Sequence, residues 1–318
     1  MLHQTLDSMR MNRFGMSFKL KFAILFIATQ AINTPAIAVN KVQSDLKNAA
    51  FCKNMANHLP GVTQNLCLQA NLVDTGARSV KGVPLLKRDV VTLGDDPASA
   101  AKLKVMVVGG IHGDELSSSA LALNWIRLAT QSPTNQAPGN AISNTPASFA
   151  GGIQWRFIPM LNPDGLTNVP AMRVNAHGVD LNRNFPTPNW ARDAKIYWEQ
   201  KTKKDPRRWP GPEPLSEPES KFLHDEMASF KPNLIVSIHA PYGVLDFDGP
   251  TVPPSKLGRL YLDQVGIFPG SLGNYGGVHK GMPVVTIELP NAQRVPLDSE
   301  TRQMWVDLLR WMGEKLKP

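Results

Sequence analysis

The chain contains few cysteines, few aromatic residues and few charged residues for its length. Its 318 residues include 2 cysteines, 7% aromatic residues and 19% charged residues. Two cysteines without a further ligand pair do not match a structural zinc site. No run of lysine and arginine with interleaved aromatic residues is present, so nucleic acid is not an expected partner. The 42% hydrophobic content is typical of a globular chain with one large domain or two small ones.

No apolar run is long enough for a stable membrane span. The apolar run at residues 22–28 follows several basic residues and precedes the small residues Ala36 and Ala38. This order predicts a signal peptide over residues 1–38, and hence a periplasmic or secreted protein. An amphipathic anchor that stays on the membrane is the alternative. Residues 1–38 hold four basic residues and one acidic residue, so their removal would lower the net charge from +8 to +5, which suits an exported protein that meets anionic cell-wall polymers.

Both cysteines, Cys52 and Cys67, follow the predicted signal peptide and lie close together in the sequence. In an oxidising compartment they are expected to form one disulfide, and two reduced core thiols are the alternative. They lie in a stretch with helical character, and we interpret residues 39–80 as a small N-terminal extension. Its core would be too small to be stable alone without the disulfide. Residues 81–318 are expected to form the main domain.

From about residue 88 onward, apolar strand patterns alternate with helical ones. One helix is expected to have Ser216 as its cap and Pro218 in its first turn. The predicted strands lie in residues 88–94, 102–112, 153–163, 232–240 and 283–290, and the predicted helices in 114–131, 216–230 and 298–317. This alternation predicts an α/β fold, a three-layer α/β/α sandwich with a mixed, largely parallel sheet.

Chemically capable side chains follow three of the predicted strands. His112 and Glu115 come just after the strand that ends in Gly109. His239 ends the sequence NLIVSIH, and Glu288 lies in VVTIELP. Ligands bind outside the carboxyl ends of the strands in open α/β sheets, so these residues are expected to meet. Two imidazoles and one carboxylate form a common catalytic zinc site, and a carboxylate in an apolar strand fits the general base.

The segment RVNAHGVDLNRNFP supplies three more polar candidates, Arg173, Asn182 and Arg183. Arginine can bind a carboxylate through two parallel hydrogen bonds, which suits a substrate with a terminal carboxylate. Ordinary structural interpretations also exist. A His-x-x-Glu pair on a turn is commonly a solvated surface pair, and Arg183 alone could form a structural salt bridge. The combination of several such residues near strand ends favours a functional site over these structural interpretations.

Four motifs in this order, GGIHGDE, GVDLNRNFP, SIH and TIELP, resemble the zinc carboxypeptidase family. The segments RSVKGVPL and GPEPLSEPES resemble its murein peptide amidase A-like branch. The resemblance extends from about Ala77 to the C-terminus. It implies a zinc carboxypeptidase-like fold and one Zn²⁺ ion held by His112, Glu115 and His239. It also implies Glu288 as the catalytic base and proton shuttle.

The same resemblance implies substrate contacts. Arg173 matches the arginine that polarises the scissile carbonyl and stabilises the oxyanion. Asn182 and Arg183 match the pair that binds the substrate carboxylate. The loop GSLGNYGGVHKG offers Tyr275 as the substrate-binding tyrosine of the family.

The resemblance therefore implies a zinc-dependent metallo-carboxypeptidase or amidase that hydrolyses a peptide bond next to a free carboxylate. The expected substrate is a murein peptide, cut at its γ-D-glutamyl-diaminopimelate bond. The alternatives are a carboxypeptidase acting on ordinary C-terminal L-residues, an N-acyl amino acid deacylase, and a catalytically inactive wall-binding module. Asp246 and Asp248 are either part of a solvated strand edge or an acidic patch for the free amine of diaminopimelate.

Overall fold

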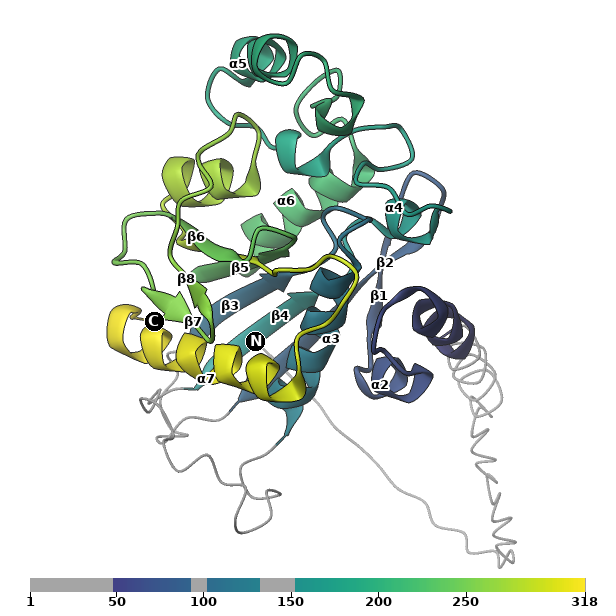
Figure 1. Ribbon diagram of the computed structural model, residues 1–318, viewed down its shortest axis with the longest axis vertical. Coiled ribbons are helices and arrows are strands. Elements are labelled where there is room, and N and C mark those ends of the chain that lie inside the picture. Colours follow the sequence, from purple (N-terminus) through teal and green to yellow (C-terminus); the bar gives the residue numbers. More distant parts are fainter. Residues whose placement is uncertain (1–47, 93–101, 132–151, 318) are drawn as a thin grey trace, which may run out of the picture. The chain divides into compact units, whose positions relative to one another are not determined.

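The computed structural model describes residues 48–92, 102–131 and 152–317 (Figure 1). All of these residues belong to one compact unit. The predicted signal peptide, residues 1–38, lies outside the described residues, as does the beginning of the predicted extension. Within the described part, no helix is both long enough and apolar enough to cross a membrane.

A mixed sheet of seven strands forms the centre of this unit (Figure 1). From edge to edge it contains β1 (Val73–Arg78), β2 (Pro84–Thr92), β4 (Ile153–Ile158), β3 (Leu103–Val108), β5 (Leu234–His239), β9 (Val284–Glu288) and β6 (Val244–Asp248). The strands β4, β3, β5 and β9 run parallel to one another. The outer strands β1, β2 and β6 pair antiparallel with their neighbours. This arrangement confirms the predicted mixed, largely parallel sheet.

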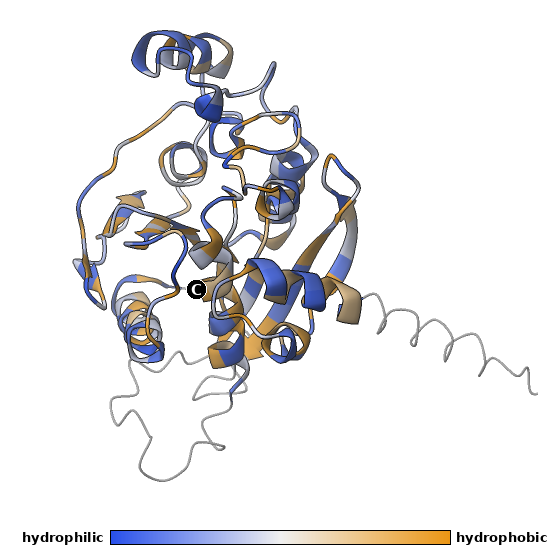
Figure 2. Ribbon diagram, turned by 45° about the vertical axis from the view of Figure 1, so that its right-hand side comes forward, coloured by the Kyte–Doolittle hydropathy of each residue, from blue (hydrophilic) through white to orange (hydrophobic). Residues whose placement is uncertain are grey.

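Helices cover both faces of this sheet. The covering helices are α3 (Leu116–Thr130), α7 (Asp298–Lys315) and α6 (Pro218–Phe230). In β3, Val105 and Val107 pack into one apolar cluster with α3 and α7, whereas Met106 and Val108 pack into a second cluster with α6. Successive side chains of a strand point to opposite faces. Figure 2 shows the strongly hydrophobic colours on the central strands. The two clusters confirm the predicted three-layer α/β/α sandwich.

Shorter elements complete the fold. They are α2 (Gln64–Gln69), α4 (Pro163–Thr167), η2 (Leu181–Arg183), α5 (Trp190–Ile196), η3 (Tyr197–Lys201), η4 (Pro206–Arg208), η5 (Gly273–His279) and the strand pair β7 (Lys256–Leu257) and β8 (Leu260–Tyr261). Pro218 lies in the first turn of α6, as expected, but the N-cap of this helix is Glu217 and not Ser216. The Ser216 hydroxyl contacts the side chains of Glu217 and Asn184, so it does not cap the helix.

Cys52 and Cys67 form the predicted disulfide, which joins the helical residues 48–58 to α2. Both cysteines are buried in the apolar cluster that also contains α3 and α7 side chains. The strand β1 lies in the last part of the predicted extension. It pairs with β2 and thereby joins this part of the extension to the main sheet. The extension is therefore held by side-chain packing and by backbone hydrogen bonds.

Replacing both Cys52 and Cys67 by serine is expected to lower the free energy of unfolding by about 3 kcal/mol. The disulfide closes a loop with a sequence separation of 15 residues. Its removal gives conformational entropy back to the unfolded chain. Urea unfolding of the double variant and of the oxidised wild type measures the difference. An unchanged midpoint would mean that the disulfide does not stabilise the domain.

Candidate metal centre and its pocket

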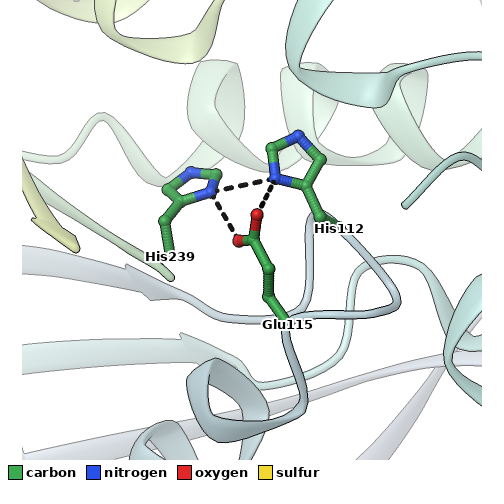
Figure 3. Close-up of side chains that lie close together, drawn as sticks. All are labelled: His112, Glu115 and His239. Atoms are coloured by element: carbon green, nitrogen blue, oxygen red, sulfur yellow. Dashed lines mark hydrogen bonds and ion pairs between the residues drawn. The ribbon is translucent and has the colours of Figure 1, made fainter. Parts of the chain in front are cut away.

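Three side chains that could bind a metal ion converge at the carboxyl ends of two neighbouring parallel strands (Figure 3). His112 and Glu115 follow β3, and His239 is the last residue of β5. His112 Nδ1 lies 2.8 Å from Glu115 Oε1 and 3.1 Å from His239 Nδ1. His239 Nδ1 lies 3.0 Å from Glu115 Oε2. All three residues are buried, and the structure brings the three predicted ligands together.

Two glycines let the chain turn sharply between β3 and His112. A Cβ atom at Gly109 would lie 2.9 Å from the carbonyl oxygens of both Pro159 and Ser118. Gly110 has a φ of +62°, a left-handed conformation that glycine adopts at little cost. Side chains are therefore disfavoured at both positions, and the sequence VVGGIH places His112 directly after the strand.

The donor set fits a zinc ion. Both histidines direct Nδ1 toward Glu115 (Figure 3), while their other ring nitrogens contact further groups. His112 Nε2 lies 3.1 Å from Asp180 Oδ1, and His239 Nε2 lies 3.0 Å from Ser237 Oγ. Such outer contacts orient metal-binding imidazoles. Burial alone would raise the pKa of the Glu115 carboxyl. The two nearby histidines lower this pKa by a larger amount, so its net shift is downward and Glu115 stays ionised. Two imidazoles and a carboxylate are ligands of many catalytic zinc sites.

Asp180 was not predicted from the sequence, and it connects the metal centre to Arg173. Its Oδ1 contacts His112, and its Oδ2 accepts a hydrogen bond from Arg173 Nε at 3.1 Å. Arg173 Nη1 also donates to Glu115 Oε1 at 3.3 Å. Burial raises the pKa of Asp180, but Arg173 and His112 outweigh it and hold the pKa well below its usual range. Asp180 lies in the motif GVDLNRNFP, yet no local pattern indicates its contact with His112.

Glu288 lies beside His239 because β5 and β9 pair in parallel with these two residues in register. Its side chain lines the same pocket as the three candidate ligands, and the residue is 7% exposed. The Oε2 atom is buried and has no hydrogen-bond partner among the described residues. Burial raises the pKa of the Glu288 carboxyl. A buried carboxylate oxygen without a hydrogen-bond partner costs folding free energy, so the position of Glu288 beside the centre indicates a functional role.

Asn182 and Arg183 belong to η2 and line the same pocket. Asn182 Oδ1 accepts a hydrogen bond from the Leu272 backbone N–H at 2.8 Å, which orients the amide. The Arg183 guanidinium lies 4.4 Å from the centroid of the Phe268 ring, and its Nε has no partner in the described part of the chain. Burial lowers the pKa of Arg183, but arginine remains a cation. A buried guanidinium beside an oriented amide can bind a carboxylate.

The structure does not bring Tyr275 to this site. Its ring is buried in the apolar cluster on the α6 side of the sheet and stacks on Phe185, with the ring centroids 5.9 Å apart. The segment η5 turns this side chain into the core, which differs from the predicted substrate contact. Tyr242 lines the pocket instead and is 59% exposed. It follows His239 closely in the sequence, but no motif singled it out.

The pocket has a volume of about 360 Å³, which is within the range of small-molecule sites. Its lining includes all of the predicted site residues except Tyr275. It also includes Asp246 and Asp248, which are each 7% exposed. β6 is an edge strand of the sheet, as the first interpretation of these residues expected, but both side chains are buried and not solvated.

Comparisons with known proteins agree with this geometry. A sequence profile of the zinc carboxypeptidase family matches residues 66–246. Murein peptide amidase A of Escherichia coli K12 is 28% identical over 242 residues, which cover 74% of this chain and 88% of that protein. Murein peptide amidase A of Vibrio campbellii is 29% identical over 221 residues, which cover 67% and 77%. Carboxypeptidase A from Helicoverpa armigera has a similar fold, with a TM-score of 0.52 at 17% identity, covering 87% of this chain and 79% of that one.

The family profile spans more than half of the chain, and the matched region contains His112, Glu115 and His239. The sheet order, the helical layers and the buried His–Glu–His group are consistent with the match. The chain belongs to the zinc carboxypeptidase family of peptide hydrolases.

Proposed function

We propose that this protein is a zinc-dependent amidase that releases diaminopimelate from murein peptides by hydrolysing the γ-D-glutamyl bond. The observation that carries the proposal is the buried Glu288 carboxylate, whose Oε2 has no hydrogen-bond partner in the described part of the chain, beside the buried group of His112, Glu115 and His239. A metal-binding group next to a carboxylate outside that group suits amide hydrolysis by water. The relatives named murein peptide amidase A support the choice of substrate.

Zinc held by these ligands would polarise the scissile carbonyl and lower the pKa of water toward neutrality. Glu288 Oε2 takes a proton from the attacking water, and the raised pKa of this carboxyl helps it to pass the proton to the leaving amine. Arg173 donates hydrogen bonds to the carbonyl oxygen as negative charge develops on it. Asn182 and Arg183 bind the free carboxylate next to the bond and position the substrate.

We further propose that residues 1–38 are a cleaved signal peptide, that residues 39–80 form an N-terminal extension, and that residues 81–318 form the catalytic domain. The Cys52–Cys67 disulfide supports an oxidising compartment, and hence a periplasmic or secreted enzyme. In that location the substrates are the stem peptides of the cell wall.

The proposed reaction is tested with L-Ala-γ-D-Glu-meso-diaminopimelate, the protein beginning at Val39 and mass spectrometry. We expect release of free diaminopimelate that a chelator blocks. The matched control peptide has an α-linked L-glutamate, and we expect its cleavage to be at least about tenfold slower. Faster cleavage of the control peptide would instead indicate an ordinary carboxypeptidase. Release of the acyl group from an N-acyl amino acid, without cleavage of either peptide, would indicate a deacylase.

A further inference from the structure

The wall of the pocket contains two arginines that the proposed hydrolysis does not use. Arg207 and Arg208 belong to η4, and both line the pocket. Each carries a permanent positive charge, because arginine is not deprotonated in proteins. The Arg208 Nε atom lies 3.6 Å from Asp205 Oδ2 in an ion pair. A substrate that enters the pocket therefore meets two cations in addition to Arg173 and Arg183.

Hydrogen bonds hold η4 close to the metal centre. The Asp205 carboxylate accepts a hydrogen bond from the Arg207 backbone N–H at 2.9 Å, and the Asp205 carbonyl accepts one from Trp198 Nε1 at 2.8 Å. Directly after η4, the Trp209 carbonyl accepts a hydrogen bond from the Asp180 backbone N–H at 2.8 Å. Asp180 also contacts one of the candidate metal ligands. The position of η4 is thus tied to the centre through Asp180.

Asp114 orients the Arg207 guanidinium. Arg207 Nη2 donates a hydrogen bond to Asp114 Oδ2 at 2.7 Å. In the described part of the chain, this guanidinium makes no other hydrogen bond or ion pair. Arginine has five N–H donors, so most of those of Arg207 stay available to a ligand. A guanidinium that is held by one nitrogen can still bind a carboxylate through its remaining donors.

Asp114 also places Arg207 on the side of the pocket where the scissile carbonyl is expected. The Gly113 backbone N–H donates to the Arg173 carbonyl at 3.3 Å, and Glu115 Oε1 accepts a hydrogen bond from Arg173 Nη1 at 3.3 Å. Asp114 lies between these two contacts in the chain. Under the proposed function, Arg173 binds the carbonyl oxygen, whereas residues of η2 bind the carboxylate of the leaving residue. We therefore place the acyl part of the substrate next to Arg207.

The acyl part of the proposed substrate carries an anion close to the scissile bond. In a γ-D-glutamyl bond the glutamate is linked through its side-chain carboxyl, so its α-carboxylate stays free. A short chain of carbon atoms joins this α-carboxylate to the scissile carbonyl carbon and spans at most about 5 Å. The anion therefore stays near the carbonyl that Arg173 binds. An arginine on the same side of the pocket matches its charge and its two oxygens.

We infer that Arg207 binds the free α-carboxylate of the D-glutamyl residue and thereby selects substrates that carry this charge. The inference rests on the proposed function, which supplies the γ-D-glutamyl bond. Peptides in which this carboxylate is an amide, so that the residue is D-isoglutamine, are then poor substrates, because the amide leaves the Arg207 cation without a counter-charge. Arg207 determines specificity and takes no part in breaking the bond.

The test compares L-Ala-γ-D-Glu-meso-diaminopimelate with the same tripeptide containing D-isoglutamine, whose α-carboxamide has nearly the same size but no charge. For the wild type, we expect kcat/KM of the charged peptide to exceed that of the amidated peptide by at least about tenfold. In the Arg207→Gln variant, we expect this preference to fall to about one, with little change in cleavage of the amidated peptide. Arg192→Gln is the matched control, because Arg192 is also exposed and paired with an aspartate but does not line the pocket.

Equal cleavage of the charged and amidated peptides by the wild type would overturn the inference. A retained preference in Arg207→Gln would do the same. Arg208→Gln tests the neighbouring cation, and a preference that is lost in this variant but kept in Arg207→Gln would also overturn the inference. The Arg207 side chain is 57% exposed, so we expect Arg207→Gln to fold and to melt near the wild-type temperature.

A binding measurement separates this inference from the proposed function. The fragments L-Ala-D-Glu and L-Ala-D-isoglutamine both have a free γ-carboxylate and differ only in the α group. They are titrated into the wild type and into Arg207→Gln, both loaded with zinc, by calorimetry. If no tripeptide is cleaved, the proposed function is wrong. Tighter binding of L-Ala-D-Glu that depends on Arg207 would still support the inference, and equal binding of the two fragments would overturn it.

Discussion

Replacing Glu288 by glutamine is expected to lower kcat by about 10²–10⁴-fold, the usual contribution of a general acid–base group. Glutamine has the same size, but it cannot accept a proton from water. Glu288 is not part of the buried His–Glu–His group, so the zinc content should stay at the wild-type level. The KM for the murein tripeptide should change little, because we assign carboxylate binding to Asn182 and Arg183.

Steady-state kinetics and metal analysis on the same preparation measure both quantities. The matched control is Glu314→Gln on the exposed surface of α7, which should behave as the wild type. The melting temperature of Glu288→Gln should be no lower than that of the wild type, because the change removes a buried carboxylate with an unpaired oxygen. A kcat within about tenfold of the wild type would fall below the contribution of a general base and exclude this role.

Removal of the metal ion is expected to abolish hydrolysis, and addition of zinc alone to restore it. Both carbonyl polarisation and water activation depend on the ion, so the loss should exceed about 10³-fold. The protein should also become less stable, because an ion that binds only the folded state stabilises it by about 2.7 kcal/mol at 100 times its Kd. Dialysis against a chelator, followed by stepwise zinc addition, measures activity and melting temperature together.

Two histidine variants test whether the loss of activity and stability on metal removal comes from an ion at the proposed centre. His239→Ala removes one of the three candidate ligands and should bind zinc more weakly. His58→Ala changes a partly exposed histidine that does not line the pocket and should give the wild-type titration curve. Full activity after complete zinc removal, or equal titration curves for the two variants, would exclude a catalytic ion at this position.

The strands that carry the site could be predicted because their local signals are strong. β3, β5 and β9 are largely apolar runs that end in, or are soon followed by, polar residues, and the predicted ranges contain all three. β6 could not be predicted in the same way, because aspartates such as Asp246 and Asp248 are unusual in strands. A Cβ atom at Gly273 or Gly277 of η5 would collide with Asp248, so the place of this aspartate depends on glycines that no pattern within β6 indicates.

The side chains of the site also divide into those that the sequence could predict and those that it could not. His112, Glu115, His239 and Glu288 could be predicted because they follow or end parallel strands of one sheet, and the carboxyl ends of these strands meet at one edge. The orientation of Tyr275 could not, because packing around η5 decides it. Long-range contacts of this kind are made by tertiary packing and are absent from local sequence patterns. The signal peptide over residues 1–38 stays a prediction.

Anomalous diffraction at the zinc absorption edge, from crystals of the protein with zinc bound, is the most direct test of the metal centre. We predict one peak that is shared by His112 Nδ1, His239 Nδ1 and the Glu115 carboxylate, with Glu288 close by but not coordinating. A peak elsewhere in the molecule, or active crystals without a peak at this position, would contradict a catalytic zinc ion held by these residues.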